Sequence, residues 1–241
     1  MTAAPTALLA IRGVIHAPTL DGADLTVRAG EFVSVLAPPG AGKSQLLALA
    51  TGQATPLRGR VRLGGADLAT LGHRRLAELL RTTVTRVPQH ADTALHPSLT
   101  AAENIALRPT LDGVPAAEAR RMALSVLLEL ELADLADLLP RELSPFHRRA
   151  VTTARALVSD RPLIVADDPV AGLEPVLADT VLALLRTRAA RGQAVLMTTR
   201  DPAHAVWADR VLLLQDGALT DPAAPVPAGA AERSTPPANV A

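Results

Sequence analysis

The sequence predicts an α/β domain in which a helical insert divides a mixed sheet, and three observations lead to that prediction. Strand-like apolar runs alternate with helix-like segments along most of the chain, as they do in α/β domains. One strand-like run ends in a glycine-rich turn, Ala37–Ser44, that leads into a helix. Between two later strand-like runs, the apolar residues recur at helical rather than strand spacing.

Each element of the sheet is predicted from a local pattern. A strand is predicted at Glu31–Leu36, because this apolar run stops at a turn rich in Gly and Pro. The apolar residues after the turn predict a helix over Ser44–Ala50. Four more short runs have the composition of buried strands. They are Thr82–Val87, Leu163–Ala166, Ala194–Thr198 and Val211–Leu214.

The helical insert is predicted from the stretch between His96 and Leu139. Apolar residues recur there at helical spacing, with charged residues between them. Gly113 and Pro115 interrupt the pattern, so two helices are expected. We predict one folded domain over residues 1–219, with the insert at about 91–159, followed by a disordered tail rich in Pro and Ala at 220–241.

The composition excludes several kinds of function. Lys and Arg (24) balance Asp and Glu (24), and aromatic residues are 1% of the chain, so no nucleic-acid partner is indicated. The absence of cysteine excludes disulfides and thiolate metal sites. No apolar run reaches the roughly 18 residues that suggest a membrane-spanning helix. A role at a membrane would therefore require another subunit.

The turn Ala37–Ser44 fits the phosphate-loop pattern, with Ala in place of the first Gly. Its glycines let the backbone curl so that N–H groups and the helix N-terminus face a phosphate. Lys43 would bridge the β- and γ-phosphates, Ser44 would bind Mg²⁺, and Pro39 adds no donor. The alternative is an ordinary strand–turn–helix connection. The predicted nucleotide-binding residues here are Ala37, Pro38, Pro39, Gly40, Ala41, Gly42, Lys43, Ser44 and Gln45.

Two acidic residues, Asp167 and Asp168, follow the apolar run Leu163–Ala166. A strand of this kind brings an acid to the carboxyl edge of the sheet, beside the phosphate loop. Asp167 would then hold Mg²⁺ through water, as phosphoryl-transfer sites require. Asp168 would lie near the γ-phosphate, where a carboxylate orients or activates water. The alternative is a pair of acids that cap the next turn.

These motifs resemble those of ABC ATPases over roughly residues 8–219, and the branch that serves lipoprotein release and macrolide export in particular. Glu103–Leu107, Ala154–Leu157 and Asp209–Val211 match that branch. The resemblance implies a P-loop NTPase of ABC type that binds ATP and Mg²⁺. It also places Gln89 at the glutamine that contacts Mg²⁺ and moves with the membrane subunit, the alternative being a solvated loop residue.

The family's signature, Leu-Ser-Gly-Gly-Gln, is altered to Leu143–His147 in this chain. In the family this segment opens a helix that binds the γ-phosphate of the partner subunit's ATP, which would make Ser144 a nucleotide-binding residue. Pro145 is acceptable at the first helical position after a Ser cap, but it removes an N–H. Phe146 places a ring where a glycine admits phosphate. The alternative is that Ser144 only caps a helix.

Four further family positions are changed. Asp168 replaces the catalytic Glu and is one methylene shorter, and Arg200 replaces the switch His. Arg cannot exchange a proton near neutral pH, although it could neutralise γ-phosphate charge; the alternative is an ordinary surface ion pair. Glu174 replaces an Asp in the next loop. The aromatic residue that stacks on adenine has no counterpart beyond His16, which is otherwise an ordinary loop residue.

The leading interpretation is an ATP-binding subunit with weak hydrolysis. It would pair with a second ABC subunit, identical or different, and couple to a membrane permease from the cytoplasmic face of the plasma membrane. The region of His96–Leu139 and the Gln89 loop would form the docking face. The alternative is a non-catalytic regulator or scaffold of a membrane complex. A soluble factor of translation or repair is disfavoured, because those proteins usually carry two cassettes or long inserted coiled coils.

Overall fold

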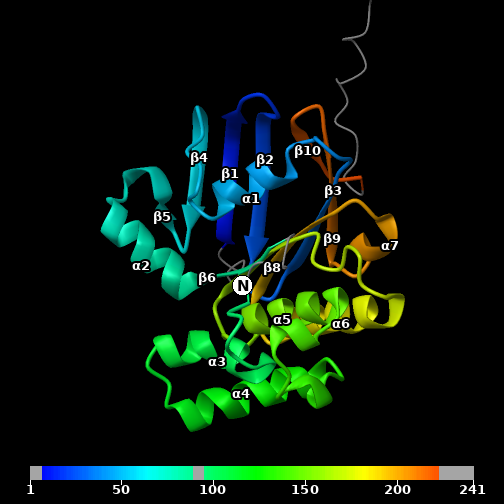
Figure 1. Cartoon of the computed structure of the whole chain (residues 1–241). Helices are drawn as coiled ribbons and strands as arrows, with labels where there is room; N and C mark the ends of the chain where they lie inside the picture. Colours follow the sequence, from blue (N-terminus) through cyan, green and yellow to red (C-terminus); the bar gives the residue numbers. More distant parts are fainter. Residues whose placement is uncertain (1–6, 89–94, 223–241) are drawn as a thin grey trace, which may run out of the picture.

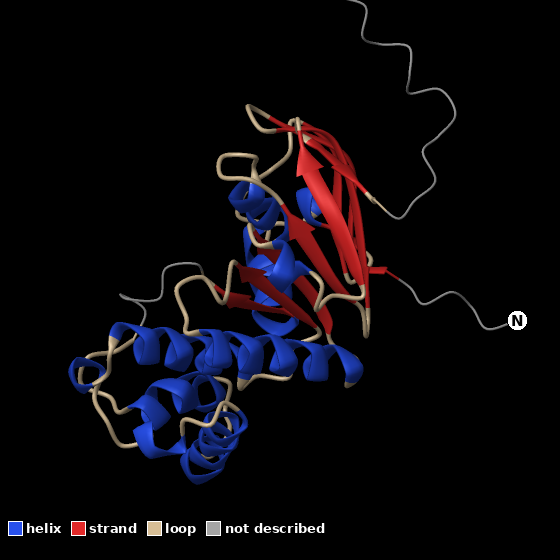
Figure 2. Ribbon diagram, turned by 90° about the vertical axis from the view of Figure 1, so that its right-hand side faces the viewer, coloured by secondary structure: helices blue, strands red, loops and turns tan. Residues whose placement is uncertain are grey.

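The computed structural model describes residues 7–88 and 95–222, which form two β-sheets and a set of helices (Figure 1). The strands gather in one part of the molecule, and the helices of residues 101–157 lie at its other end (Figure 2). This arrangement confirms the predicted α/β class and the helical insert. The tail from residue 223 onward lies outside the described residues, and the predicted domain limits stay predictions.

The central sheet has six strands in the order β10-β9-β3-β8-β7-β6. They are β3 (Phe32–Leu36), β6 (Val84–Val87), β7 (Leu163–Asp167), β8 (Ala194–Thr199), β9 (Arg210–Gln215) and β10 (Ala218–Thr220). All neighbours pair in parallel except β9 and β10, which are antiparallel. The sheet is therefore mixed, as predicted, and the carboxyl ends of its parallel strands share one edge.

Four predicted strands agree with the structure to within one residue at each end, and the fifth begins later than predicted. The helix α2 (His73–Thr83) continues through Thr83, so β6 starts at Val84 and not at Thr82. The Thr82 hydroxyl donates to the Glu78 carbonyl at 2.9 Å. A threonine whose hydroxyl bonds to the carbonyl at position i−4 is compatible with a helix. Because β-branched residues are common in strands, the sequence alone placed Thr82 in the strand.

A second sheet of four antiparallel strands, ordered β2-β1-β4-β5, is not among the elements predicted from the sequence. Its strands are β1 (Ala7–His16), β2 (Leu20–Arg28), β4 (Arg58–Leu63) and β5 (Ala66–Asp67). Buried and exposed residues alternate in β2, but register shifts interrupt the pairing of β1 between Ile11 and Val14. Such bulges break the period of two that identifies a strand.

The insert between β6 and β7 contains the three helices α3 (Ala101–Leu111), α4 (Ala116–Glu129) and α5 (Pro145–Leu157). A capping box starts α3, since the Thr100 hydroxyl accepts from the Glu103 N–H while the Glu103 carboxylate accepts from the Thr100 N–H. Gly113 has a φ of +95°, which suits glycine. The predicted division of the insert near Gly113 and Pro115 is confirmed. Short 3-10 turns are η1 (Leu68–Thr70), η2 (Ala133–Leu135) and η3 (Pro140–Glu142).

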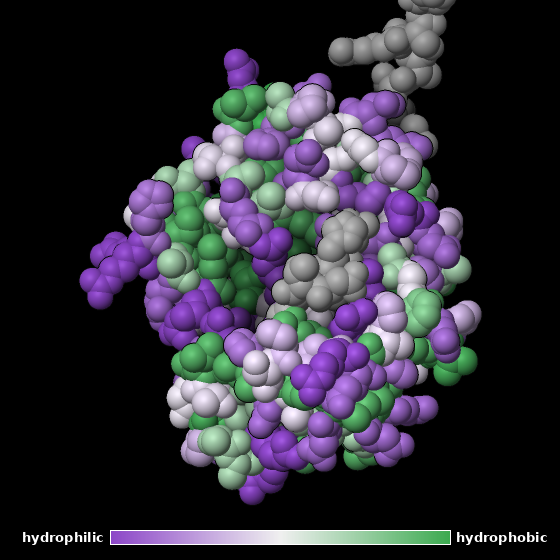
Figure 3. Space-filling model, viewed as in Figure 1, coloured by the Kyte–Doolittle hydropathy of each residue, from purple (hydrophilic) through white to green (hydrophobic). Residues whose placement is uncertain are grey.

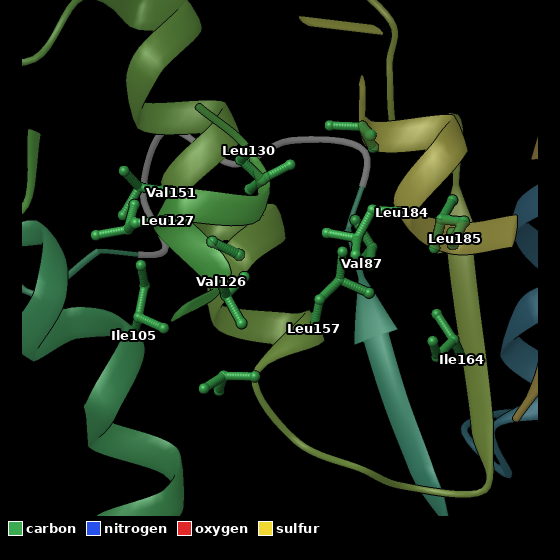
Figure 4. Close-up of a cluster of buried hydrophobic side chains, with 14 of the residues drawn as sticks. Val87, Ile105, Val126, Leu127, Leu130, Val151, Leu157, Ile164, Leu184 and Leu185 are labelled. Atoms are coloured by element: carbon green, nitrogen blue, oxygen red, sulfur yellow. The ribbon is translucent and has the colours of Figure 1, made fainter. Parts of the chain in front are cut away.

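Both faces of the central sheet are covered. On one face α1 (Lys43–Ala50) and the antiparallel sheet pack against it. On the other face α6 (Pro175–Ala190) and the insert share one apolar cluster with the sheet. Figure 4 shows residues of that cluster converging from α3, α4, α5, α6 and the strands β6 and β7. The insert and the sheet are therefore joined by continuous packing. The short helix α7 (Pro202–Ala205) follows β8.

The continuous core gives a stability prediction for two neighbouring leucines of α4. Leu127 is fully buried, whereas Leu128 is 68% exposed. Leu127→Ala should lower the free energy of unfolding by about 2–5 kcal/mol, because it removes buried surface and leaves a cavity. Leu128→Ala should change it by about 0.5 kcal/mol or less. Urea unfolding of both variants measures the difference, and equal effects would contradict the proposed packing.

Candidate functional site

The phosphate loop, Ala37–Ser44, connects the end of β3 to the start of α1. Gly40 and Gly42 have φ values of +79° and +104°, which L-residues rarely adopt. A Cβ added to Gly42 would lie 2.8 Å from the Thr19 hydroxyl oxygen. Gly42 is therefore required both by its own backbone conformation and by the neighbouring β1–β2 connection.

The Lys43 ammonium folds back over the loop. Its Nζ donates to the Ala37 carbonyl at 2.7 Å and to the Pro38 carbonyl at 2.9 Å. Burial lowers the pKa of Lys43, and Arg200 lowers it further, while Asp168 and Asp167 oppose these effects. Lys43 is thus a cation held within the loop, with the carboxylates of Asp167 and Asp168, at the end of β7, in its electrostatic environment.

Asp167 ends β7 and lies beside the start of α1. Its two carboxylate oxygens accept from Ser44 Oγ at 3.4 Å and from Thr198 Oγ1 at 2.8 Å. The structure thus brings together Ser44 and Asp167, two of the three predicted Mg²⁺-binding residues. The third, Gln89, lies outside the described residues. Thr198 was not predicted; its place beside Asp167 in the parallel register is the signal that could have identified it.

The described residues contain no group of three or more His, Cys, Asp or Glu side chains arranged to hold a metal ion. Proteins usually bind Mg²⁺ through one or two ligands plus phosphate oxygens and water. The oxygen donors of Ser44 and Asp167 suit Mg²⁺ in kind and in number.

Asp168 is 3% exposed and has a φ of +44°. Its side-chain oxygens are both engaged, one by Arg200 Nε at 3.2 Å and the other by Thr199 Oγ1 at 3.4 Å. An Arg149 guanidinium nitrogen from α5 donates to the Asp168 carbonyl at 3.0 Å. Asp168 and Arg200 therefore form an ion pair with each other, and the predicted catalytic roles of both residues stay predictions.

The altered signature segment begins α5. Ser144 is its N-cap, and the Ser144 hydroxyl accepts from the His147 N–H at 3.1 Å. Pro145 occupies the first helical position, and Phe146 is 45% exposed. Ser144 therefore caps α5, and its predicted contact with nucleotide stays a prediction.

An open groove of about 540 Å³ continues from the phosphate loop toward the β1–β2 connection and β10. It is lined by Pro18, Thr19, Asp21, Pro38, Pro39, Gly40, Ala41, Gln215, Asp216 and Gly217. No aromatic ring is in this list, and neither is His16. Asp216 and Gly217 were not predicted as site residues. The hydrogen bond from Asp21 N to Gly217 O, at 2.9 Å, brings them to the groove.

Taken together, these features define a class of protein. A glycine-rich loop runs from a parallel strand to a helix, with Lys43 and Ser44 at the helix start and Asp167 at the end of another parallel strand of the same sheet. This arrangement is a phosphate-loop nucleotide-binding site. A family model described as "ABC transporter" matches residues 20–171. The chain belongs to the ABC transporter family, in which it is an ATP-binding cassette.

Curated relatives agree with this assignment. The macrolide export ATP-binding/permease protein MacB of Brucella melitensis is 36% identical over 207 residues, which cover 86% of this chain and 32% of MacB. The lipoprotein-releasing system ATP-binding protein LolD of Paramagnetospirillum magneticum is also 36% identical, over 84% of this chain and 89% of LolD. The chain thus spans about a third of the length of MacB and most of the length of LolD.

Solved structures share the fold. The dimeric structure of MJ0796, a bacterial ABC transporter cassette, has a TM-score of 0.78 at 28% identity and covers 88% of this chain. A post-hydrolysis dimer of the same cassette, bound to ADP and Pi, has a TM-score of 0.77. Separately, the described part of this chain contains no helix that is long and apolar enough to cross a membrane.

The geometry of Gly42 gives a prediction for ligand binding. Gly42→Ala should lower the affinity for a fluorescent ATP analogue by about tenfold or more, because the positive φ and the contact with Thr19 force the loop out of shape. Gly72→Ala is the matched control, since Gly72 has an ordinary φ of −68° and open space at its Cβ. Equal affinities in the two variants would show that the loop does not bind the phosphates.

Proposed function

We propose that this chain binds Mg-ATP at the phosphate loop, hydrolyses it slowly, and couples the nucleotide cycle to a membrane permease. The arrangement of Lys43, Ser44 and Asp167 carries the proposal. It places an ammonium, a hydroxyl and a carboxylate around the N-terminus of α1, where a polyphosphate and its divalent cation would bind. Gln45, in the first turn of α1, belongs to the same proposed site.

Each residue then has a defined task. Lys43 would exchange its two carbonyl contacts for phosphate oxygens. Ser44 and Asp167 would hold Mg²⁺, and Gln89 would complete its surroundings. The bound ion would neutralise charge on the phosphates. Thr198 would hold Asp167 in place, because its hydroxyl already binds one oxygen of that carboxylate at 2.8 Å.

Slow hydrolysis is proposed from the contact between Asp168 and Arg200. A general base must be free to accept a proton from water, whereas Asp168 is buried and its carboxylate accepts from a guanidinium. Arg200 remains protonated near neutral pH, so it does not accept a proton itself. The side chain of Asp168 is shorter than that of Glu, and its carboxylate is paired with Arg200. Both features act against activation of water.

We propose that the chain works as a dimer, with an identical or a related cassette as the second subunit. The solved cassettes that it resembles are described as dimeric. In a head-to-tail pair, the N-terminus of α5 would face the partner's γ-phosphate through Ser144. Pro145 lacks an N–H and Phe146 is half-exposed beside it, so this helix end is a poorer phosphate site than a Gly-Gly segment would be.

The permease partner and the location at the cytoplasmic face of the plasma membrane are part of the same proposal. MacB is named as an ATP-binding/permease protein, and the match with the present chain covers 32% of its length. LolD is named as the ATP-binding protein of a lipoprotein-releasing system. A permease that contributes the membrane-spanning segments would complete the transporter.

A second candidate function is a non-catalytic regulator that binds nucleotide without turnover. The same Asp168–Arg200 contact favours it, because the Asp168 carboxylate is already paired with a guanidinium at 3.2 Å and is less available as a general base. Measurement of turnover separates the two functions, since both predict nucleotide binding.

The ATPase prediction concerns five substitutions made together. Pro145→Gly, Phe146→Gly, His147→Gln, Asp168→Glu and Arg200→His should raise turnover by on the order of 10²-fold or more over the unchanged protein. Asp168→Glu with Arg200→His should have a smaller effect, because the partner's altered signature still faces each site. Phosphate release from Mg-ATP is the measurement.

The control for this experiment adds Lys43→Ala to the five substitutions, which should abolish the restored activity. The proposed slow hydrolysis is contradicted if the unchanged protein already turns over within the usual enzyme range, about 1–10³ s⁻¹, and loses that activity with Lys43→Ala.

The docking prediction uses two leucines of nearly equal exposure on different surfaces. Leu111 ends α3 in the insert and is 72% exposed, and Leu57 precedes β4 and is 70% exposed. The chain has no native cysteine, so Leu111→Cys and Leu57→Cys each supply a single thiol. In membranes that contain the co-expressed permease, Leu111→Cys should cross-link to it and Leu57→Cys should not. The reverse result would move the docking face to the antiparallel sheet.

A further inference from the structure

The open groove beside the phosphate loop is large enough for the nucleoside part of a nucleotide. Its volume of about 540 Å³ is within the roughly 300–1,000 Å³ of most small-molecule sites. A second hollow, of about 510 Å³, contains Asp168 and Arg200, and Pro39 lines both. The hollow with Asp168 is the proposed γ-phosphate end of the site. A nucleotide held at the loop would therefore place its base and ribose in the first groove, which we call the nucleoside groove.

The nucleoside groove offers hydrogen-bonding groups, and its lining residues include no aromatic ring. Besides residues of the phosphate loop, Asp21, Gln215 and Asp216 line it. The surface around β10 is mostly hydrophilic (Figure 3). Stacking on an aromatic ring, which favours every base alike, is therefore not available from this lining. Recognition of a base in the groove has to come from hydrogen bonds to its edge.

The backbone that carries Asp21 and Asp216 is held in a fixed shape. Asp216 and Gly217 form the two-residue turn between β9 and β10, and their φ values of +48° and +80° suit a type I′ turn. The Asp21 N–H donates to the Gly217 carbonyl at 2.9 Å, and a Cβ added to Gly217 would lie 2.7 Å from that nitrogen. The turn and the start of β2 are therefore packed closely against each other, which brings both acidic residues to the same part of the groove.

The two carboxylates are unpaired in the described part of the chain. Both side chains are exposed, and neither Asp21 nor Asp216 forms a side-chain hydrogen bond or an ion pair within residues 7–88 and 95–222. Because like charges repel, two carboxylates near a polyphosphate oppose its binding unless they accept hydrogen bonds from another part of the ligand. The groove therefore favours a nucleoside that presents N–H groups to these acceptors.

Guanine suits these side chains better than adenine does. The edge of guanine presents the N1–H and N2–H₂ donors next to the O6 acceptor, whereas the edge of adenine presents one amino group next to the N1 acceptor. A carboxylate has acceptors only. It can therefore receive two neighbouring N–H groups of guanine at once, but its second oxygen would face the lone pair of adenine N1. The Gln215 amide also has N–H donors, which suit the O6 of guanine.

We propose that the nucleoside groove selects guanine through Asp21 and Asp216, so that the chain binds Mg-GTP more tightly than Mg-ATP. The inference rests on the proposed function, since the phosphate loop would hold the phosphates of either nucleotide. It adds the base that the same site prefers. Hydrogen bonds to two carboxylates take the place of the stacking ring that this lining lacks.

Competition between unlabelled nucleotides and a fluorescent ATP analogue, measured on the full chain, tests the proposal. Mg-GTP should displace the analogue at a concentration about fivefold or more below that of Mg-ATP, which is the lower end of the discrimination expected from a bidentate contact to a base. Mg-ITP, whose base keeps N1–H and O6 but lacks the N2 amino group, should lie between them. Mg-2′-deoxy-GTP should equal Mg-GTP, because the proposed contact is to the base and not to the ribose.

Asp21→Asn and Asp216→Asn should each reduce the ratio of GTP to ATP affinity by about twofold or more, because an amide has one acceptor oxygen in place of two. The double variant should abolish the preference. Both residues are exposed, and Asn tolerates the positive φ of Asp216, so these variants should fold.

Asp24→Asn is the matched control. Asp24 is an exposed residue of β2, the same strand as Asp21, and it does not line the groove. Its carboxylate accepts from the Gly13 N–H at 3.1 Å, and the side-chain oxygen of Asn can accept the same bond. This substitution also removes one negative charge, but it should leave the preference for GTP unchanged.

Equal displacement by Mg-GTP and Mg-ATP overturns the proposal, and so does a preference for GTP that survives in the double variant. Tighter binding of GTP than of 2′-deoxy-GTP, without a difference between GTP and ATP, overturns it in favour of a contact with the ribose. The Lys43→Ala variant separates the two levels of inference. Binding of the analogue that is lost with Lys43→Ala, without a preference for GTP, refutes guanine selection alone, whereas no binding of any nucleotide refutes the proposed function as well.

Discussion

The parallel pairing of β3, β8 and β7 is the constraint on which the rest of the site depends. In this register Leu36 lies opposite Thr199, and Asp167 lies opposite Thr198. The phosphate loop therefore leaves β3 at the level where β8 ends in Thr198 and Thr199 and where β7 ends in Asp167. Residues 37 and 199 come together only through the sheet. The order and the register of these strands therefore cannot be predicted from a short stretch of sequence. Buried strands with apolar residues on both faces fix that register.

The same edge of the sheet determines the charge balance of the site. Lys43 and Arg200 supply two positive charges, and Asp167 and Asp168 supply two negative ones. Lys43 is held by carbonyl oxygens of its own loop, which leaves Arg200 to pair with Asp168. A histidine at position 200 would hold at most a partial charge near neutral pH. The change to arginine therefore couples the two altered positions, and neither should be interpreted without the other.

Sequence reasoning identified the groups whose positions follow from a local motif. The phosphate loop and Asp167 are of this kind, because a glycine turn between strand and helix has few possible shapes. It could not identify the Asp168–Arg200 contact, which depends on a left-handed backbone at Asp168 and on neighbouring strands. The antiparallel sheet was missed because bulges interrupt the alternation in β1. The grouping of Arg86, Arg108 and Arg155 around one cavity was not predicted, because these residues come from three different elements.

Helix α5 connects the surroundings of Asp168 to the junction of the sheet and the insert. Arg149 contacts the backbone of Asp168, while Arg155, on the same helix, lines a cavity of about 270 Å³ between β6, α3 and α5. These residues are six positions apart, which is about 9 Å along a helix. The apolar cluster around Val151 and Leu157 ties α5 to α3, α4 and α6, so the helix cannot shift alone (Figure 4). A displacement at Asp168 would therefore act on the whole packed insert and not on α5 alone.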